Sequence, residues 1–230
     1  MKKVSFRNIF ICIIILGVFT SCSSMDEYYA DYIAGAEKIF PGKADSVRIY
    51  PGNERAMVST QLSSDPKVVK LLIYWNNKQD SLILPVAKSE IGQTKKIIIT
   101  PLKEGNYNFE LLTYDDESNP SLSTEGFVRV YGEKYISSLS NRIISKSGFN
   151  ANNVAYINWV PVNSKTLIGT KISYANQDND QIEIFMGKNE KTILLTNYKP
   201  GGIIQYTSSF LPEEMAIDTF YTSVKSIVIQ

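Results

Sequence analysis

From residue 46 to residue 230, short apolar runs are separated by turn residues, and several of the runs alternate apolar with polar side chains. A period of two is typical of half-buried β-strands. The first seven runs cover residues 46–50, 55–62, 68–75, 80–86, 95–100, 107–114 and 123–131. Short strands at this spacing are typical of an immunoglobulin-like sandwich, so we predict one over residues 46–131.

Residues 132–230 show a second, related pattern after a Ser-rich polar connector over residues 132–153, which we expect to be partly helical around residues 135–147. Further strands are predicted over residues 154–160, 167–174, 181–186, 191–195, 203–211 and 222–229. Trp159 lies on the first of these strands, where sandwich domains bury a tryptophan between their sheets. The pattern therefore predicts a second β-sandwich-like module over residues 132–230.

The stretch before one alternating strand, residues 102–107, has the sequence LKEGNY. It resembles the tyrosine corner of fibronectin type III modules, in which a tyrosine hydroxyl hydrogen-bonds back to the chain before it. This resemblance implies such a bond for Tyr107. Together with the strand pattern, it predicts an all-β chain with two immunoglobulin- or fibronectin type III-like β-sandwich modules in tandem.

The N-terminus differs from the rest of the chain. Lys2, Lys3 and Arg7 precede an apolar run over residues 9–19 that is too short to span a bilayer comfortably. The sequence that follows, Phe-Thr-Ser-Cys ending at Cys22, resembles a lipobox, where a bacterial signal peptide is cut before a lipid-modified cysteine. The resemblance implies a signal peptide over residues 1–21, lipidation of Cys22, and a lipidated tether over residues 22–45. An ordinary secretory signal or an uncleaved anchor are the alternatives.

The residues after Cys22 refine the expected location. Ser23 stands where the enterobacterial sorting rule needs an aspartate for inner-membrane retention. Asp26 and Glu27 resemble the surface-export signal of Bacteroidetes lipoproteins, although they can also serve only to keep a tether solvated. We therefore expect a lipid-anchored protein of the outer membrane, exposed on the cell surface.

Composition narrows the possible chemistry. Cleavage before Cys22 removes three of the 24 basic residues, so 21 remain against 23 acidic ones, and no basic run offers a footprint for nucleic acid. The chain has no histidine, and its two cysteines are Cys12 in the apolar run and the lipidation candidate Cys22. Zinc sites, thiol chemistry and histidine-based catalysis are thereby excluded from the mature chain. We expect no enzyme activity, no metal and no cofactor, with a carboxylate-based hydrolase as the alternative.

Several motifs identify a family. Residues 41–47, 50–53, 64–66 and 73–77, which read PGKADSV, YPGN, SDP and IYWNN, resemble the Bacteroidetes lipoprotein family called domain of unknown function 4998. Residues 210–214 and 216–221, which read FLPEE and AIDTFY, resemble its C-terminal motif. The resemblance implies a surface lipoprotein often found near glycan-uptake systems, and it supplies no catalytic residues.

One aromatic turn is the candidate ligand site. Tyr74, Trp75, Asn76 and Asn77 combine aromatic faces, on which sugars stack, with amides that hydrogen-bond hydroxyl groups. The period of two places Trp75 inward if Ile73 is inward, and it then leaves Tyr74 exposed. A core tryptophan beside a β-turn is the alternative. The polar segment over residues 176–180 lacks the glycine and the distal glutamate of a calcium loop, which favours a hairpin tip.

Together these observations favour a non-catalytic surface lipoprotein that binds a glycan or a partner protein, as an accessory to a glycan-uptake system. A structural scaffold or adhesin subunit without a small ligand is the second hypothesis.

Overall fold

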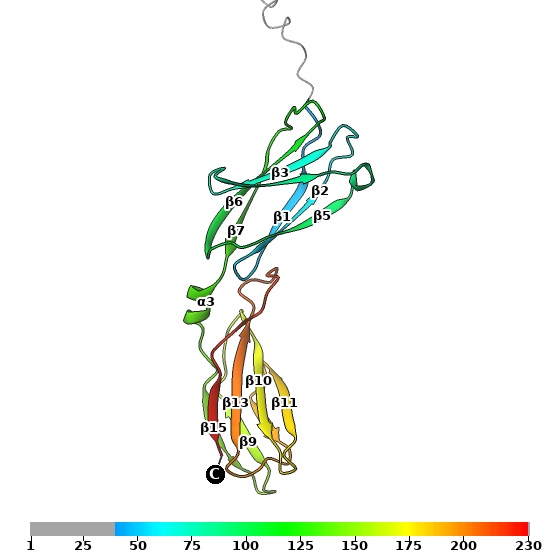
Figure 1. Cartoon of the computed structure of the whole chain (residues 1–230). Helices are drawn as coiled ribbons and strands as arrows, with labels where there is room; N and C mark the ends of the chain where they lie inside the picture. Colours follow the sequence, from blue (N-terminus) through cyan, green and yellow to red (C-terminus); the bar gives the residue numbers. More distant parts are fainter. Residues whose placement is uncertain (1–39, 230) are drawn as a thin grey trace, which may run out of the picture. The chain divides into compact units, whose positions relative to one another are not determined.

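The computed structural model describes residues 40–229, and most elements in this part of the chain are β-strands (Figure 1). Two β-sandwiches follow one another in the sequence, as predicted. Within residues 40–229, no helix has the length and hydropathy that crossing a membrane requires.

The first sandwich contains all seven predicted strands in two antiparallel sheets. The three-stranded sheet has the order β1-β2-β5, and the four-stranded sheet has the order β4-β3-β6-β7. The strands are β1 (Asp45–Pro51), β2 (Ala56–Gln61), β3 (Lys70–Trp75), β4 (Asp80–Pro85), β5 (Thr94–Ile99), β6 (Gly105–Tyr114) and β7 (Thr124–Val130). A short 3-10 helix, η1 (Lys88–Glu90), lies between β4 and β5.

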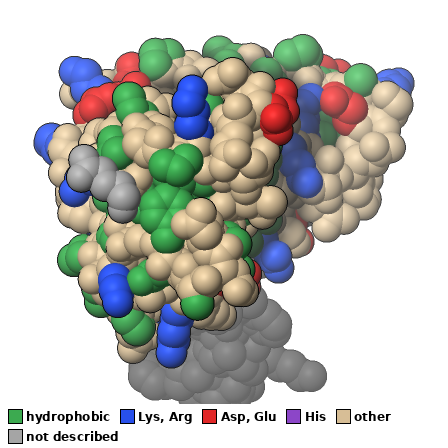
Figure 2. Space-filling view, turned by 90° about the horizontal axis from the view of Figure 1, so that it is seen from below, with side chains coloured by type: hydrophobic (Ala, Val, Ile, Leu, Met, Phe, Trp, Pro, Cys, Tyr) green, Lys and Arg blue, Asp and Glu red, His purple; other side chains and the backbone are tan. Residues whose placement is uncertain are grey.

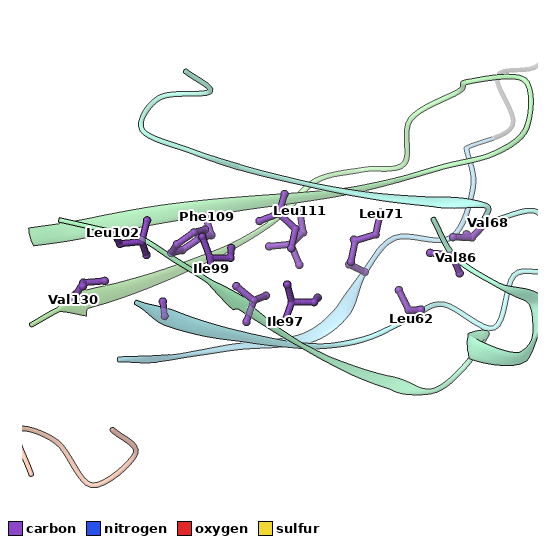
Figure 3. Packing of buried hydrophobic residues seen from close by; sticks show 14 residues of the cluster. Leu62, Val68, Leu71, Val86, Ile97, Ile99, Leu102, Phe109, Leu111 and Val130 are labelled. Carbon is purple, nitrogen blue, oxygen red and sulfur yellow. The ribbon is translucent and has the colours of Figure 1, made fainter. Parts of the chain in front are cut away.

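The core of the first sandwich lies between these two sheets. Phe109 and Leu111 of β6 point toward Ile97 and Ile99 of β5, and all four side chains are buried (Figure 3). The residues that alternate with them along β6, such as Glu110, face the other side of the sheet. Strand β6 therefore separates the core from an outer face of the four-stranded sheet.

The tyrosine corner is present. The Tyr107 hydroxyl donates a hydrogen bond to the Lys103 carbonyl oxygen at 3.0 Å. This confirms the bond that the resemblance of residues 102–107 implied, and it joins the start of β6 to the loop before it.

The second sandwich has a similar division into two sheets. One sheet has the order β12-β9-β8, and the other has the order β11-β10-β13, with β14 and β15 both paired to β13. The strands are β8 (Ile144–Phe149), β9 (Ala155–Trp159), β10 (Leu167–Ala175), β11 (Gln181–Gly187), β12 (Thr192–Leu195), β13 (Ile203–Phe210), β14 (Phe220–Tyr221) and β15 (Lys225–Val228). All pairings are antiparallel, and the predicted fold class is confirmed.

Trp159 occupies the core of the second sandwich, as expected. Its side chain is 2% exposed, and its ring meets that of Tyr206 edge-on with a centroid separation of 5.2 Å. The guanidinium carbon of Arg142 lies 5.4 Å from the Trp159 ring centre. This core shares no residue with the core of the first sandwich.

The expected connector over residues 132–153 needs correction. Its helix, α3 (Glu133–Ser138), is shorter than expected, and residues 144–149 form strand β8 instead of connector. Strand β8 is an edge strand that pairs only with β9, and none of its six residues is fully buried. It therefore has few of the apolar residues by which a strand is recognised.

Helix α3 begins where it does because of a distant side chain. Its N-cap residue, Gly132, has no side chain to cap the first turn. The carboxylate of Glu104 instead accepts hydrogen bonds from the backbone N–H groups of Lys134 at 2.7 Å and Tyr135 at 3.3 Å. A carboxylate at this end of a helix satisfies free N–H groups and interacts favourably with the helix dipole.

Candidate ligand-binding surface

Strand β3 places Tyr74 and Trp75 on opposite sides of the four-stranded sheet. Trp75 is half-buried and packs against the core, with its ring centre 6.0 Å from that of Phe109. Tyr74 lies opposite Glu110 of β6 on the outer face and is partly exposed. The inward direction of Trp75 and the outward direction of Tyr74 agree with the expected alternation.

The turn after β3 depends on two asparagines. Asn76, Asn77 and Lys78 have φ angles of 49°, 52° and 65°, in the left-handed region that asparagine tolerates better than most residues. The Asn76 amide donates a hydrogen bond to the Asp80 carboxylate. Asn76 therefore closes the turn, while Asn77 faces a hollow on the surface.

This first hollow has a volume of about 280 Å³. Its lining residues are Tyr74, Trp75, Asn77, Lys78, Asn108 and Glu110. Lys78 crosses the hollow, because its Nζ lies 2.9 Å from a Glu110 oxygen and 5.8 Å from the Tyr74 ring centre. The hydrogen bond to Glu110 raises the pKa of Lys78 and favours its charged form.

Three of the candidate residues thus meet in the first hollow, and three residues that the sequence did not single out join them. Lys78 follows directly after the candidate turn, whereas Asn108 and Glu110 come from β6. Their polar positions in the alternating pattern of β6 were a signal that they face outward. Only the pairing of β3 with β6 shows that they lie beside Tyr74.

A second, wider hollow of about 720 Å³ adjoins the first, and the two share Asn77 and Asn108. The other lining residues are Ile49, Asn106, Tyr107, Phe127, Val128, Arg129 and Glu213. Phe127 lies directly opposite Asn108 in the pairing of β6 with β7, and its side chain is 75% exposed. The second hollow therefore contains another exposed aromatic residue among amide side chains.

The chemistry of both hollows suits reversible binding. Amide, carboxylate and ammonium groups donate and accept hydrogen bonds, and the aromatic rings offer apolar faces.

Within residues 40–229, no three acidic or other metal-ligating side chains gather into a site for a metal ion. In the segment over residues 176–180, the Asn176 side-chain oxygen accepts hydrogen bonds from the backbone N–H groups of Asp178 and Asp180, which closes a hairpin tip.

Charged side chains do not gather by sign on the face that Figure 2 presents. Lys and Arg are interspersed there with Asp and Glu, and hydrophobic side chains lie between them (Figure 2). Such a mixture differs from the continuous basic surface that attracts a phosphate backbone.

A polar cluster forms around Asp218, in the loop between β13 and β14. Its carboxylate accepts hydrogen bonds from the Asn53 backbone N–H at 2.8 Å and from the Arg55 Nε at 2.9 Å. The hydrogen bond and charge of Arg55 hold the pKa of Asp218 below its usual value. Gly52 leaves the space for this contact, because a Cβ there would lie 2.6 Å from the carboxylate. The cluster joins two segments that the family motifs include.

Aromatic side chains add to the contacts near this cluster. Tyr131, Tyr135 and Phe220 meet edge-on, with centroid separations between 4.8 and 6.0 Å. The Tyr131 hydroxyl donates a hydrogen bond to the Glu213 carboxylate at 2.7 Å. Burial, reinforced by this bond, raises the pKa of Tyr131 to about 12. Tyr131 therefore stays protonated and continues to donate at physiological pH.

Comparison with known proteins gives a family and many structural neighbours. No curated protein matches the chain. One neighbour is the crystal structure of the FN1–FN3 domains of chicken CNTN1, with 10% identity and a TM-score of 0.44 over 83% of this chain and 66% of that one. Another is a segment of two fibronectin type III domains from chicken tenascin, with 11% identity and a TM-score of 0.32 over 81% of this chain and 98% of that one.

The predicted lipidation site, Cys22, lies outside the residues that the structure describes. A family model does include it: the model of DUF4998, a domain of unknown function, matches residues 22–220. Because the match covers most of the sequence and agrees with the motifs noted above, this chain belongs to the DUF4998 family.

Proposed function

We propose that this protein is a non-catalytic lipoprotein of the outer-membrane surface that binds a glycan in the hollow beside Tyr74, as an accessory to glycan uptake. The observation that carries the proposal is the composition of that hollow. A partly exposed tyrosine ring lies beside the Lys78–Glu110 pair and the amides of Asn77 and Asn108. A carbohydrate site needs an aromatic ring on which a sugar can stack and polar side chains that hydrogen-bond its hydroxyl groups.

The carboxylates near this hollow support binding in preference to hydrolysis. Glycoside hydrolysis commonly uses two carboxyl groups that flank the scissile bond. Glu110 is paired with Lys78, and Glu125, its cross-strand neighbour, accepts a hydrogen bond from Asn108 at 3.3 Å. Each carboxylate is thus already engaged by a neighbouring side chain, Glu110 by the Lys78 ammonium and Glu125 by the Asn108 amide. We therefore assign Glu110, which lines the hollow, to ligand contact, and Glu125 to the surrounding surface.

Replacing Tyr74 with alanine tests the proposed site. An aromatic contact contributes about 0.5–1.5 kcal/mol beyond the area that it buries, so we expect the variant to bind glycan about tenfold more weakly. Because Tyr74 faces outward, the free energy of unfolding of the variant should differ from that of the wild-type chain by less than about 1 kcal/mol. A glycan array probed with the full chain identifies the ligand, and titration of that ligand gives both affinities.

Tyr221→Ala is the matched control. Tyr221 lies in β14, is 55% exposed and lines neither hollow, so this variant should keep the wild-type affinity. An array without any hit for the folded wild-type chain would remove the glycan proposal. A Tyr74→Ala variant that loses stability as strongly as affinity would instead assign Tyr74 to the fold.

A scaffold subunit is the second candidate function. The observation that favours it is the set of contacts around Asp218, which link the loop after β13 to the turn between β1 and β2. Such contacts serve a protein that holds other components in place without binding a small ligand. A negative glycan array combined with co-purifying protein partners would favour this function.

A further inference from the structure

Two of the aromatic residues on the outer face of the four-stranded sheet line the two hollows. Tyr74 belongs to the first hollow and Phe127 to the second, and Asn77 and Asn108 line both. We propose that the ligand is an uncharged oligosaccharide of at least two sugar units, which lies across both hollows and stacks on Phe127 as well as on Tyr74. This inference rests on the proposed function and specifies its ligand class.

The strand register places the two aromatic residues on one face. Tyr74 lies opposite Glu110, and Phe127 lies opposite Asn108, which is two residues from Glu110 along β6. Directly opposed residues, and residues two apart on one strand, share a face of the sheet. Two strand spacings and two residues of rise separate Tyr74 from Phe127 by about 12 Å. A single sugar ring does not reach across this distance, whereas a chain of sugars does.

The exposure of Phe127 supports a second platform. At 75%, it is the highest among the large hydrophobic side chains of residues 40–229. The residue before it, Gly126, faces β1, where Ile49 leaves no space for a side chain. Gly126 and Val128, the neighbours of Phe127, therefore face the core side of the sheet, and the Phe127 side chain faces solvent, where a ligand can contact it. Isolated exposed hydrophobic residues are common, so its place inside the hollow is what distinguishes it.

The charges that line the hollows balance. The cations are Lys78 and Arg129, and the carboxylates are Glu110 and Glu213. Lys78 and Glu110 neutralise each other, and Glu213 accepts the Tyr131 hydroxyl. The remaining polar groups include the amides of Asn77, Asn106 and Asn108, which match hydroxyl groups because they both donate and accept hydrogen bonds. This lining favours a neutral glycan over a uronate or a sulfated one.

A chain-length series tests the inference. The probes are mono-, di-, tetra- and hexasaccharides of glucose, xylose, mannose and galactose, with polygalacturonate and heparin fragments as acidic probes. The full chain and its Tyr74→Ala, Phe127→Ala and Phe185→Ala variants are titrated with each probe. Phe185→Ala is the matched control, since Phe185 lies in β11, is 58% exposed and lines neither hollow.

We expect wild-type affinity for one neutral series to increase at least tenfold between the monosaccharide and the tetrasaccharide. Phe127→Ala should remove this gain and leave monosaccharide binding unchanged, whereas Tyr74→Ala should weaken binding at every length. Tighter binding of the acidic probes, an affinity independent of length, or an unaffected Phe127→Ala variant would overturn the inference while the proposed function remained. Absence of binding to every probe would overturn both.

Discussion

Replacing Trp159 with alanine is expected to lower the free energy of unfolding of the second sandwich by about 3–5 kcal/mol. The substitution removes a ring that is 2% exposed and packs edge-on against Tyr206, and it leaves a cavity that the two sheets cannot fill. Chemical denaturation of the full chain, followed by far-ultraviolet circular dichroism, measures the change. Circular dichroism is preferred to tryptophan fluorescence, because the substitution removes one of the two tryptophans.

Phe109→Ala provides the matched comparison. Phe109 is fully buried in the core of the first sandwich, which shares no residue with the core around Trp159. We expect a loss of similar size, but in the unfolding transition of the first sandwich. Trp75→Ala should lower the free energy of unfolding by less than either of these substitutions, since Trp75 is only half-buried. A Trp159→Ala variant that unfolds at the wild-type denaturant concentration would show that Trp159 is not part of the core.

Replacing Cys22 with alanine is expected to abolish lipid labelling and release the chain from the membrane fraction. The prediction follows from the proposed lipoprotein signal, whose apolar run over residues 9–19 ends just before the Thr-Ser-Cys sequence. Each buried methylene of an acyl chain contributes about 0.8 kcal/mol, so several chains on one cysteine anchor a protein stably. Metabolic labelling with palmitate and fractionation of the cells measure the two effects.

Cys12→Ala is the control for this experiment. Cys12 is the only other cysteine of the chain and lies inside the apolar run. Its replacement should leave both labelling and membrane association unchanged. Palmitate labelling that persists in the Cys22→Ala variant would contradict the lipobox assignment.

Local patterns were sufficient to predict most of the fold. The alternation along residues 105–114 follows from burial of one face, and the structure places Phe109 and Leu111 inward. The hydrogen bond of the Tyr107 hydroxyl was predictable because the tyrosine corner connects residues only four apart in sequence. Trp159 was predictable because its position on a central strand leaves it few alternatives to burial.

Elements determined by distant residues were not predictable in the same way. Strand β8 is an edge strand with a weak apolar pattern, and only its pairing with β9 shows that residues 144–149 are extended. Helix α3 depends on Glu104, about thirty residues earlier in the chain, for the hydrogen bonds at its first turn. The contact of Asp218 with Arg55 joins residues 163 positions apart, although both lie in or beside recognisable motifs.

The candidate site illustrates the same distinction. Tyr74 and Asn77 were recognisable because an aromatic residue and an amide beside a turn have a local chemical meaning. Lys78 is adjacent to them, but no local pattern distinguishes it, because its partner Glu110 lies 32 residues later. The pattern over residues 123–131 identifies Phe127 only as a strand residue, and its place in a hollow follows from the order β3-β6-β7.

Amide chemical-shift mapping by NMR tests the central claim most directly, namely that the outer face of the four-stranded sheet binds a glycan. The full chain is titrated with the oligosaccharide that binds most tightly in the chain-length series. We predict shift changes concentrated at Asn77, Asn108 and Phe127, with residues near Phe185 in the second sandwich unaffected. Shift changes confined to the second sandwich, or none at saturating ligand, would contradict the claim.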